Sequence, residues 1–266
     1  MMSTTHALAD SATMLRRNLR HARRYPAMTI SVIFGPVLML LLFFGVFGNT
    51  LGAGISAGTG FKGDYIDYLT PGIVLMAVTS GCMVVSVAVA VDMTEGVIAR
   101  FRTMAVFRTA VLNGHVAGGV LQTAASTALV LAIAVALGFR SHDATLLDWL
   151  GAIGLLLFLI VALSWLACGL GLWSKGPESA SNTPLIVQFL PFLGSAVVPP
   201  EQMPASIRWF AEYQPFTPII ETLRGLLLGT PVGNDAWTSL AWCAGLTALG
   251  YLWSRRLFAR DPKHAS

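Results

Sequence analysis

The side chains able to carry out chemistry in this 266-residue chain are few and widely spaced. No HExxH motif is present, and the five histidines never lie four residues apart. Cys82, Cys168 and Cys243 lie in three different apolar stretches without CxxC or CxxH spacing, so we expect unpaired thiols that behave as small apolar residues. The sequence therefore predicts a protein that is not an enzyme and that binds no metal or cofactor itself.

An ATP-binding P-loop would require a glycine directly before a lysine. The three lysines, Lys62, Lys175 and Lys263, instead follow phenylalanine, serine and proline. The chain is therefore not expected to bind ATP by that motif, and any ATP-driven activity would need another subunit.

The composition is that of an integral membrane protein. Apolar residues make up 55% of the chain and charged residues 11%, whereas soluble domains have about 45–50% and about 25%. Six uncharged apolar runs predict membrane-spanning helices, because about 20 such residues cross the hydrocarbon core. They are residues 27–48, 68–91, 116–139, 149–173, 183–198 and 237–253. The fifth run is short and contains two prolines, and the first is too long for a cleaved signal peptide.

Ionisable side chains are absent from the middle of all six runs, and Asp92 and His115 lie only at the inner ends. Ion-coupled transporters usually keep such groups within their spans, so the sequence disfavours that class. The remaining hypothesis is a membrane subunit that is powered by another protein.

Positive residues near span ends are retained on the cytoplasmic side and therefore predict the orientation. With the N-terminus inside, thirteen lysines and arginines are cytoplasmic and four are outside: Lys62, Arg140, Arg208 and Arg224. We therefore expect a multi-pass protein of the inner or plasma membrane with both termini in the cytoplasm. The stretch after the fifth run is then extracytoplasmic.

Two basic cytoplasmic segments have helical patterning. Residues 8–25 place apolar residues on one face and arginines beside them, which predicts a helix along the inner surface with arginines at lipid phosphates, or else only a topology signal. In the second segment, Thr94 is expected to cap a helix whose first turn carries Glu95. Its apolar stripe is Val97, Phe101 and Met104, flanked by Arg100, Arg102 and Arg108. Such a stripe suits a groove in a partner protein, although a helix resting on the membrane has the same pattern.

Prolines divide the stretch that follows the fifth run. Pro199, Pro200, Pro204, Pro215 and Pro218 leave room only for short helices, at 205–213 and 219–228. Glu221 and Arg224 lie three apart and can pair on one face. The segment is predicted to cap the outer mouth of a path or to be a wet loop. The aromatic residues Trp209, Phe210, Tyr213 and Phe216 are candidates for contact with an amphipathic substrate or for interfacial anchoring.

Several stretches resemble one family of transporters. They are EGVIARFRTMAVFRTAVL at 95–112, LGFR at 137–140, ALSWLACGLGL at 162–172, VPPEQMPASIRWFAEYQPFTPIIETLRGLLLG at 198–229 and SRRLFAR at 254–260. Together they resemble type-2 ABC exporter permeases, in particular the daunorubicin-type antibiotic and multidrug efflux permeases. One departure is Ala105, Val106 and Phe107, where members commonly have a proline and a small polar residue, so pairing with other ATPase subunits is in question.

The resemblance implies an all-α integral membrane protein. Residues 1–26 would hold the amphipathic interfacial helix, 27–254 the six-span permease domain and 255–266 a cytoplasmic tail. The permease domain would contain a coupling-helix region at 94–113 and a re-entrant segment at 199–230.

The resemblance also implies partners. Two copies of a cytoplasmic ATP-binding subunit would hold ATP and Mg, and a second permease chain, identical or paralogous, would complete the path. The expected cargo is an antibiotic or another amphipathic small molecule, and no nucleic acid is expected to bind. Export of a lipid-linked glycan or lipid, or a non-transport immunity or scaffold role, remains as an alternative.

Overall fold

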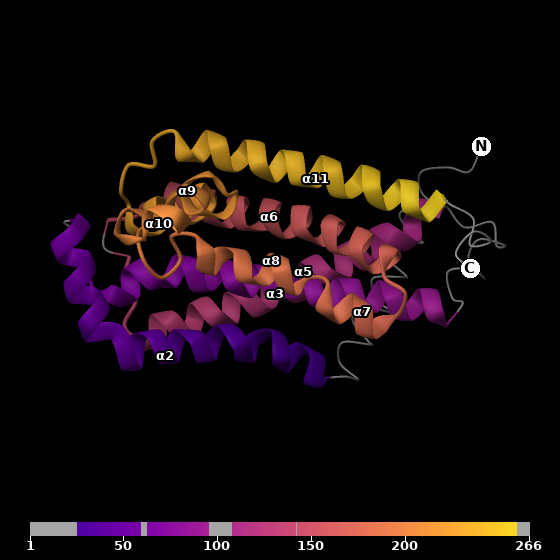
Figure 1. Cartoon of the computed structure of the whole chain (residues 1–266), viewed down its shortest axis with the longest axis horizontal. Helices are drawn as coiled ribbons and strands as arrows, with labels where there is room; N and C mark the ends of the chain where they lie inside the picture. Colours follow the sequence, from indigo (N-terminus) through magenta and orange to yellow (C-terminus); the bar gives the residue numbers. More distant parts are fainter. Residues whose placement is uncertain (1–25, 60–62, 96–107, 142, 260–266) are drawn as a thin grey trace.

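Five long helices run along the length of the protein in the part of the chain that the structure describes (Figure 1). This computed structural model describes residues 26–59, 63–95, 108–141 and 143–259, with the backbone alone at 26–32, 58–59 and 108–111. The long helices are α2 (Pro26–Thr59), α3 (Tyr65–Thr94), α5 (Arg108–Leu137), α6 (Leu146–Trp173) and α11 (Asp235–Ala259). Figure 1 shows that α2 and α5 run one way, and α3, α6 and α11 the other.

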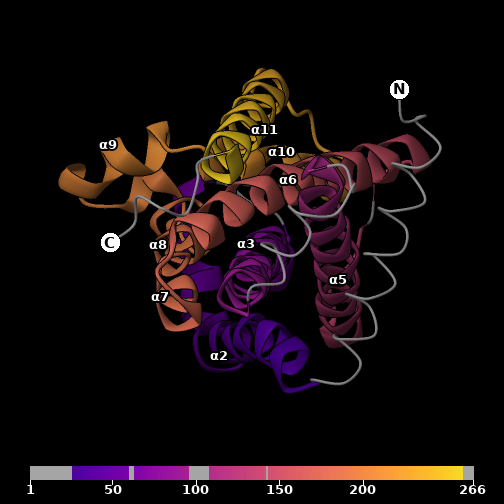
Figure 2. The ribbon, with the colours of Figure 1, turned by 90° about the vertical axis from the view of Figure 1, so that its right-hand side faces the viewer.

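The central helix of the bundle is α3. In the end-on view of Figure 2, α2, α5, α6, α7 and α8 surround it, and all five contact it. In an apolar stretch of 18 residues of α3, 83% of the residues are buried. The corresponding shares are 11% for α2, 28% for α5 and 50% for α6. An evenly apolar helix is stable where protein or lipid covers every side, so α3 forms the core and the other helices present apolar side chains outward. We name the two ends of the bundle after the residues of α3 that lie there, the Tyr68 end and the Asp92 end.

Four of the described helices are long and apolar enough to cross a membrane: α2, α3, α5 and α6. The fifth long helix, α11, has 25 residues and would measure about 37 Å at the usual helical rise. A helical fold is thus confirmed for the described residues, while the count of six spans stays a prediction. All five long helices extend beyond their predicted runs, and the largest extensions are those of α2, which continues to Thr59, and α5, which begins at Arg108.

The fifth apolar run is not one helix. Short pieces carry the chain back towards the Tyr68 end: α7 (Pro177–Asn182), α8 (Leu185–Phe189) and the 3-10 helix η1 (Leu190–Leu193). A proline lies at the start of each piece, namely Pro177, Pro184 and Pro191. Proline has no N–H to donate and restricts the residue before it. Pro184 and Pro191 therefore divide the run, and Pro177 precedes it.

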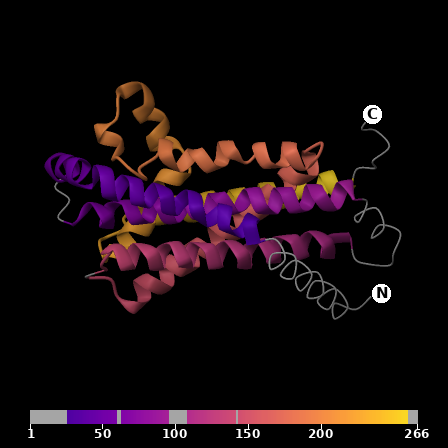
Figure 3. The same ribbon diagram turned by 90° about the horizontal axis from the view of Figure 1, so that it is seen from below.

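The Tyr68 end is completed by three more short helices, η2 (Pro200–Gln202), α9 (Ala205–Tyr213) and α10 (Phe216–Leu228). The bounds of α9 agree with the predicted 205–213. By contrast, α10 begins three residues before the predicted 219, because Pro218 fits in a first helical turn, where its missing N–H has no helical partner. The helix ends at Gly229, whose φ of +72° is the left-handed conformation that favours glycine at a helix end. In Figure 3 the segment with α9 stands away from the long helices.

The predicted cap at Thr94 is wrong. Thr94 is the last residue of α3, its hydroxyl donates to the carbonyl of Val91 at 2.9 Å, and Glu95 is the C-cap. Most of the predicted partner-binding residues, Val97, Arg100, Phe101, Arg102 and Met104, lie outside the described residues, as do the amphipathic segment 8–25 and the end of the tail. Arg108 begins α5. The two long helices α3 and α5 therefore flank residues 96–107.

Candidate functional site

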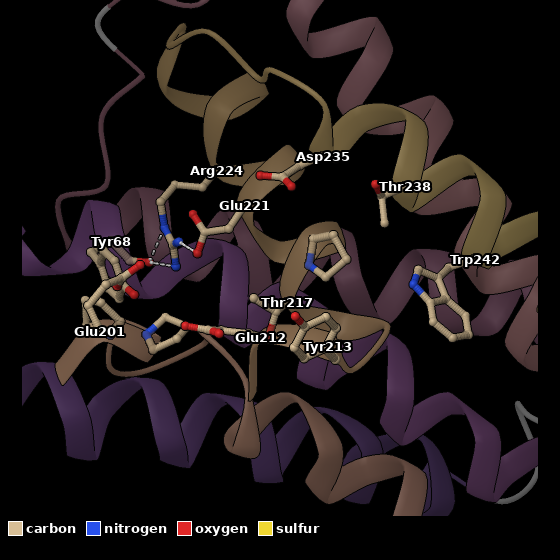
Figure 4. Close-up of a pocket in the computed structure, with 13 residues that line it drawn as sticks. Tyr68, Glu201, Glu212, Tyr213, Thr217, Glu221, Arg224, Asp235, Thr238 and Trp242 are labelled. Atoms are coloured by element: carbon tan, nitrogen blue, oxygen red, sulfur yellow. Dashed lines mark hydrogen bonds and ion pairs between the residues drawn. The ribbon is translucent and has the colours of Figure 1, made fainter. Parts of the chain in front are cut away.

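Arg224 on α10 joins three elements at the Tyr68 end. Its Nε donates to the backbone carbonyl of Tyr68 at 3.3 Å, and one terminal nitrogen donates to the carbonyls of Tyr68 and Ser195 at 3.2 and 2.8 Å. The other terminal nitrogen pairs with Glu221. The guanidinium also lies 3.8 Å from the ring centroid of Tyr68, within cation–π range. We call Arg224, Glu221, Tyr68 and Ser195 the Arg224 anchor, and Figure 4 shows the first three of them.

The surroundings of Arg224 account for this dense set of bonds. Only 6% of the residue is exposed. A buried guanidinium is costly unless its N–H groups are bonded, and its planar fork suits several acceptors at once. The backbone carbonyls, the carboxylate of Glu221 and the aromatic ring supply those contacts. Arg224 is therefore held in place from α3, from α10 and from the chain that follows η1.

The chain that follows η1 lies directly against α3. The hydroxyls of Tyr68 and Tyr65 donate to the carbonyls of Ser195 and Val197 at 3.2 and 3.4 Å. At Gly72, an added Cβ would meet the carbonyl oxygen of Ala196 at 2.5 Å. The absence of a side chain at Gly72 thus allows residues 195–197 to approach the helix backbone.

A cleft of about 870 Å³ opens beside the anchor. This volume lies within the range of pockets that hold drug-sized molecules. In Figure 4, Asp235, Thr238 and Trp242 lie along one side on α11, and Glu201, Glu212 and Tyr213 face them. The remaining lining residues are Tyr68, Pro199, Pro200, Thr217, Pro218, Glu221 and Arg224.

The lining of the cleft has more negative than positive groups. It includes four carboxylates, those of Glu201, Glu212, Glu221 and Asp235, and one guanidinium, that of Arg224. Glu221 is paired with Arg224, and Glu212 accepts a hydrogen bond from Arg208 at 2.6 Å. Partial burial, with the Glu221 carboxylate nearby, raises the pKa of Asp235, which precedes the apolar part of α11. A cationic group would be favoured here over an anionic one.

Residues 11–228 match the family described as ABC-2 type transporter. The chain belongs to this family. It is 28% identical over 262 residues to the daunorubicin resistance ABC transporter permease protein DrrB1 of Streptomyces coeruleorubidus. This alignment covers 97% of this chain and 89% of the relative. It is 26% identical over 234 residues to the probable doxorubicin resistance ABC transporter permease protein DrrC of Mycobacterium tuberculosis, covering 88% of this chain and 83% of the relative.

In this ABC-2 transporter chain, three of the six aromatic and charged residues singled out at the predicted outer end line the cleft. They are Tyr213, Glu221 and Arg224, and the predicted ion pair between the last two is confirmed. Trp209 and Phe210 are exposed on α9 but are not among the lining residues, and Phe216 is only 2% exposed. The structure therefore brings together the charged pair and one aromatic residue of the set.

Several lining residues escaped the sequence analysis. Tyr68 begins an apolar run and Trp242 lies within another, so neither stands out from neighbouring residues. Their place beside Arg224 and Tyr213 depends on how α3, α10 and α11 meet. Glu201 and Asp235 are acidic residues next to apolar stretches. That position was the only local feature of the sequence that could have marked them as lining residues.

The remaining expectations concern metals, thiols and the coupling region. Among the described residues no group of three or more histidines, cysteines or carboxylates is arranged to hold a metal ion. Cys82, Cys168 and Cys243 are free and buried, which confirms the expectation for the thiols. Glu95, predicted to belong to the coupling helix, is an exposed residue directly after α3.

Proposed function

We propose that this chain is the membrane permease subunit of an ATP-driven exporter that moves an antibiotic or another amphipathic small molecule out of the cell. The observation that carries the proposal is the alignment of 97% and 88% of the chain with two permeases named for resistance to daunorubicin and doxorubicin. A drug-sized cleft beside the central helix fits a small-molecule cargo.

Two copies of a separate cytoplasmic subunit would bind ATP and Mg and dock on the Asp92 end. The docking residues would be Glu95, Val97, Arg100, Phe101, Arg102, Met104 and Arg108. These residues link the end of α3 with the start of α5. A movement of the bound ATPase would therefore act on two long helices, one of which is the core of the bundle.

A second permease chain, identical or paralogous, would complete the transporter. Support comes from α2, because only 11% of the residues in its apolar stretch of 18 residues are buried within the same chain. Support also comes from α7, α8 and η1, because interrupted backbone at membrane depth needs protein or a water-filled cavity beside it. Both termini and the Asp92 end would face the cytoplasm, and the Tyr68 end would lie at the outer surface.

The cleft at the Tyr68 end would be the exit site. Tyr213 and Trp242 could contact an apolar ring of the cargo, and the carboxylates would favour a cationic group on it. Trp209, Phe210 and Phe216 would support the short helices that border the exit. The Arg224 anchor would hold this border against α3.

The test is transport into inverted membrane vesicles that contain the chain and its ATPase subunit. We expect ATP-dependent accumulation of doxorubicin or another cationic amphipathic drug from a panel that also includes lipids. An ATPase subunit with an inactive P-loop is the control. If the ATPase copurifies but no compound accumulates, the exporter proposal fails and a scaffold role gains support.

A second test concerns the ATPase contact. The substitutions Phe101→Glu and Met104→Glu put charge into the predicted apolar stripe, and we expect them to abolish copurification with the ATPase while leaving membrane insertion intact. Unchanged copurification would remove these residues from the docking surface.

A further inference from the structure

A buried histidine–aspartate pair lies at the end of α3 opposite the Arg224 anchor. Nε2 of His115 on α5 lies 3.1 Å from Oδ2 of Asp92 in the last turn of α3, and the two side chains are 6% and 8% exposed. Neither residue lines the cleft. Ionisable groups within membrane helices are costly and are usually retained for a function, so the pair needs an explanation.

Packing alone does not explain the pair. Asp92 lies near the C-terminal end of α3, where the helix dipole disfavours negative charge. Val89, three residues before Asp92, and Leu112 and Val116, close to His115 in the sequence, belong to the buried apolar core. Replacing a buried polar or ionic pair with apolar residues of similar volume is often neutral or stabilising. An apolar pair could therefore join α3 to α5 here, and the polar pair adds a directional bond between one atom of each helix.

The bond to Asp92 is the one polar contact of the imidazole that the structure records. Nδ1 of His115 is buried and has no hydrogen-bond partner among the described residues. The ring is therefore oriented chiefly through Nε2, and loss of Asp92 would leave it without that constraint.

Between this pair and the Tyr68 end, α3 and α5 pack closely through two glycines. An added Cβ at Gly81 of α3 would meet Oγ1 of Thr123 at 2.1 Å, and one at Gly119 of α5 would meet Cγ2 of Val85 at 2.2 Å. Such contacts leave little room for one helix to slide past the other without repacking. The helix α3 then continues to Tyr68 and the Arg224 anchor.

We propose that Asp92 and His115 form a positioning clamp that fixes the ends of α3 and α5 on either side of residues 96–107. The clamp makes the two helices move together, so that a displacement by the ATPase is transmitted along α3 to the Arg224 anchor and the cleft. This role rests on the proposed function, because it requires an ATPase docked between the two helices. The residues are positioning residues and do not contact the cargo.

The clamp is tested in the full complex of permease and ATPase in inverted vesicles, with doxorubicin as the probe. Doxorubicin transported per ATP hydrolysed is measured together with the thermal midpoint of the purified complex. The double variant D92L/H115L removes both polar groups and keeps the site filled. We expect it to assemble with a near-normal midpoint but to transport about threefold to thirtyfold less drug per ATP, the range over which single contacts change coupling between sites.

Two further variants define the result. H115Q keeps an N–H donor for Asp92 and is expected to transport more drug per ATP than the double variant. T127V removes a buried hydroxyl of α5 that has no hydrogen-bond partner and is expected to match the wild type.

Wild-type drug transport per ATP in D92L/H115L would overturn the clamp, as would H115Q performing no better than the double variant. A wild-type complex that accumulates no drug would instead reject the exporter proposal, so the two failures are distinguishable.

Discussion

The two ends of α3 are held in different ways. At the Tyr68 end, Arg224 bonds to two backbone carbonyls from separate elements, pairs with Glu221 and stacks on an aromatic ring. At the Asp92 end, Asp92 of α3 bonds to His115 of α5. In the first arrangement one guanidinium holds three parts of the chain through several contacts, whereas in the second the pair joins two helices. The Tyr68 end is therefore suited to move as one body, and the Asp92 end to receive the movement.

The largest expected difference between the two ends is the side of the membrane on which each lies. Thr230, exposed between α10 and α11, is near the Tyr68 end, and Ser179, exposed on α7, is near the Asp92 end. In intact cells we expect an impermeant maleimide to label T230C, and to label S179C only after permeabilisation. The wild-type chain is the control, because its three cysteines are buried. The reverse labelling pattern would invert the proposed orientation.

Substitution of Arg224 should destabilise the Tyr68 end. Arg224→Met removes the guanidinium that donates to the carbonyl of Tyr68 and is one of two donors to the carbonyl of Ser195, and it leaves Glu221 without its ion pair. We expect a loss of about 3 kcal/mol in the free energy of unfolding. The thermal midpoint in detergent should fall by about 10 °C. Arg208→Ala is the matched control, because its ion pair with Glu212 is exposed and should not affect the midpoint measurably.

An unchanged midpoint in R224M would show that the anchor does not stabilise this end. The comparison with D92L/H115L is informative, since that variant is expected to lose drug transport per ATP and R224M to lose stability.

A smaller effect is expected where the chain after η1 touches α3. Gly72→Ala places a Cβ 2.5 Å from the carbonyl oxygen and 2.6 Å from Cα of Ala196, and both are backbone atoms that cannot rotate away. We expect a loss of about 1–3 kcal/mol, typical of an overpacked core, again measured as the thermal midpoint. Gly154→Ala in α6 is the control, because no atom lies within 4 Å of its added Cβ. Equal midpoints for the two variants would contradict the close approach at Gly72.

Features fixed by neighbouring residues could be predicted from the sequence. The helix 205–213 and the pair of Glu221 with Arg224 follow from proline positions and from a spacing of three residues. The end of α3 was misjudged, because an acceptable capping residue at Thr94 also fits inside a helix. Nothing in the local sequence distinguishes the two cases. Asp92 lies in the last turn of α3, as its position at the end of an apolar run predicted, but nothing in the local sequence indicates its pair with His115 on α5.

The cleft and the anchor depended on contacts between distant residues. The sequence predicted a pair of Arg224 with Glu221, whereas the backbone acceptors of Arg224 belong to Tyr68 and Ser195, which are distant in the sequence. Phe216 was grouped with interfacial aromatics, but α10 begins at this residue and its face packs inward with Ile219, Ile220 and Leu223. The topology has to be known before either position can be assigned.

The smallest effect is expected for the hydroxyl of Tyr68. Tyr68→Phe keeps the ring beneath the guanidinium and removes only the 3.2 Å hydrogen bond to the carbonyl of Ser195, which also accepts from Arg224. Because that carbonyl keeps one donor, we expect a loss of about 1 kcal/mol or less, measured as the thermal midpoint beside R224M. A loss in Y68F as large as that in R224M would mean that the hydroxyl, rather than the guanidinium, holds residues 195–197 on α3. With the expected small loss, Arg224 is the residue on which the rigidity of the Tyr68 end depends.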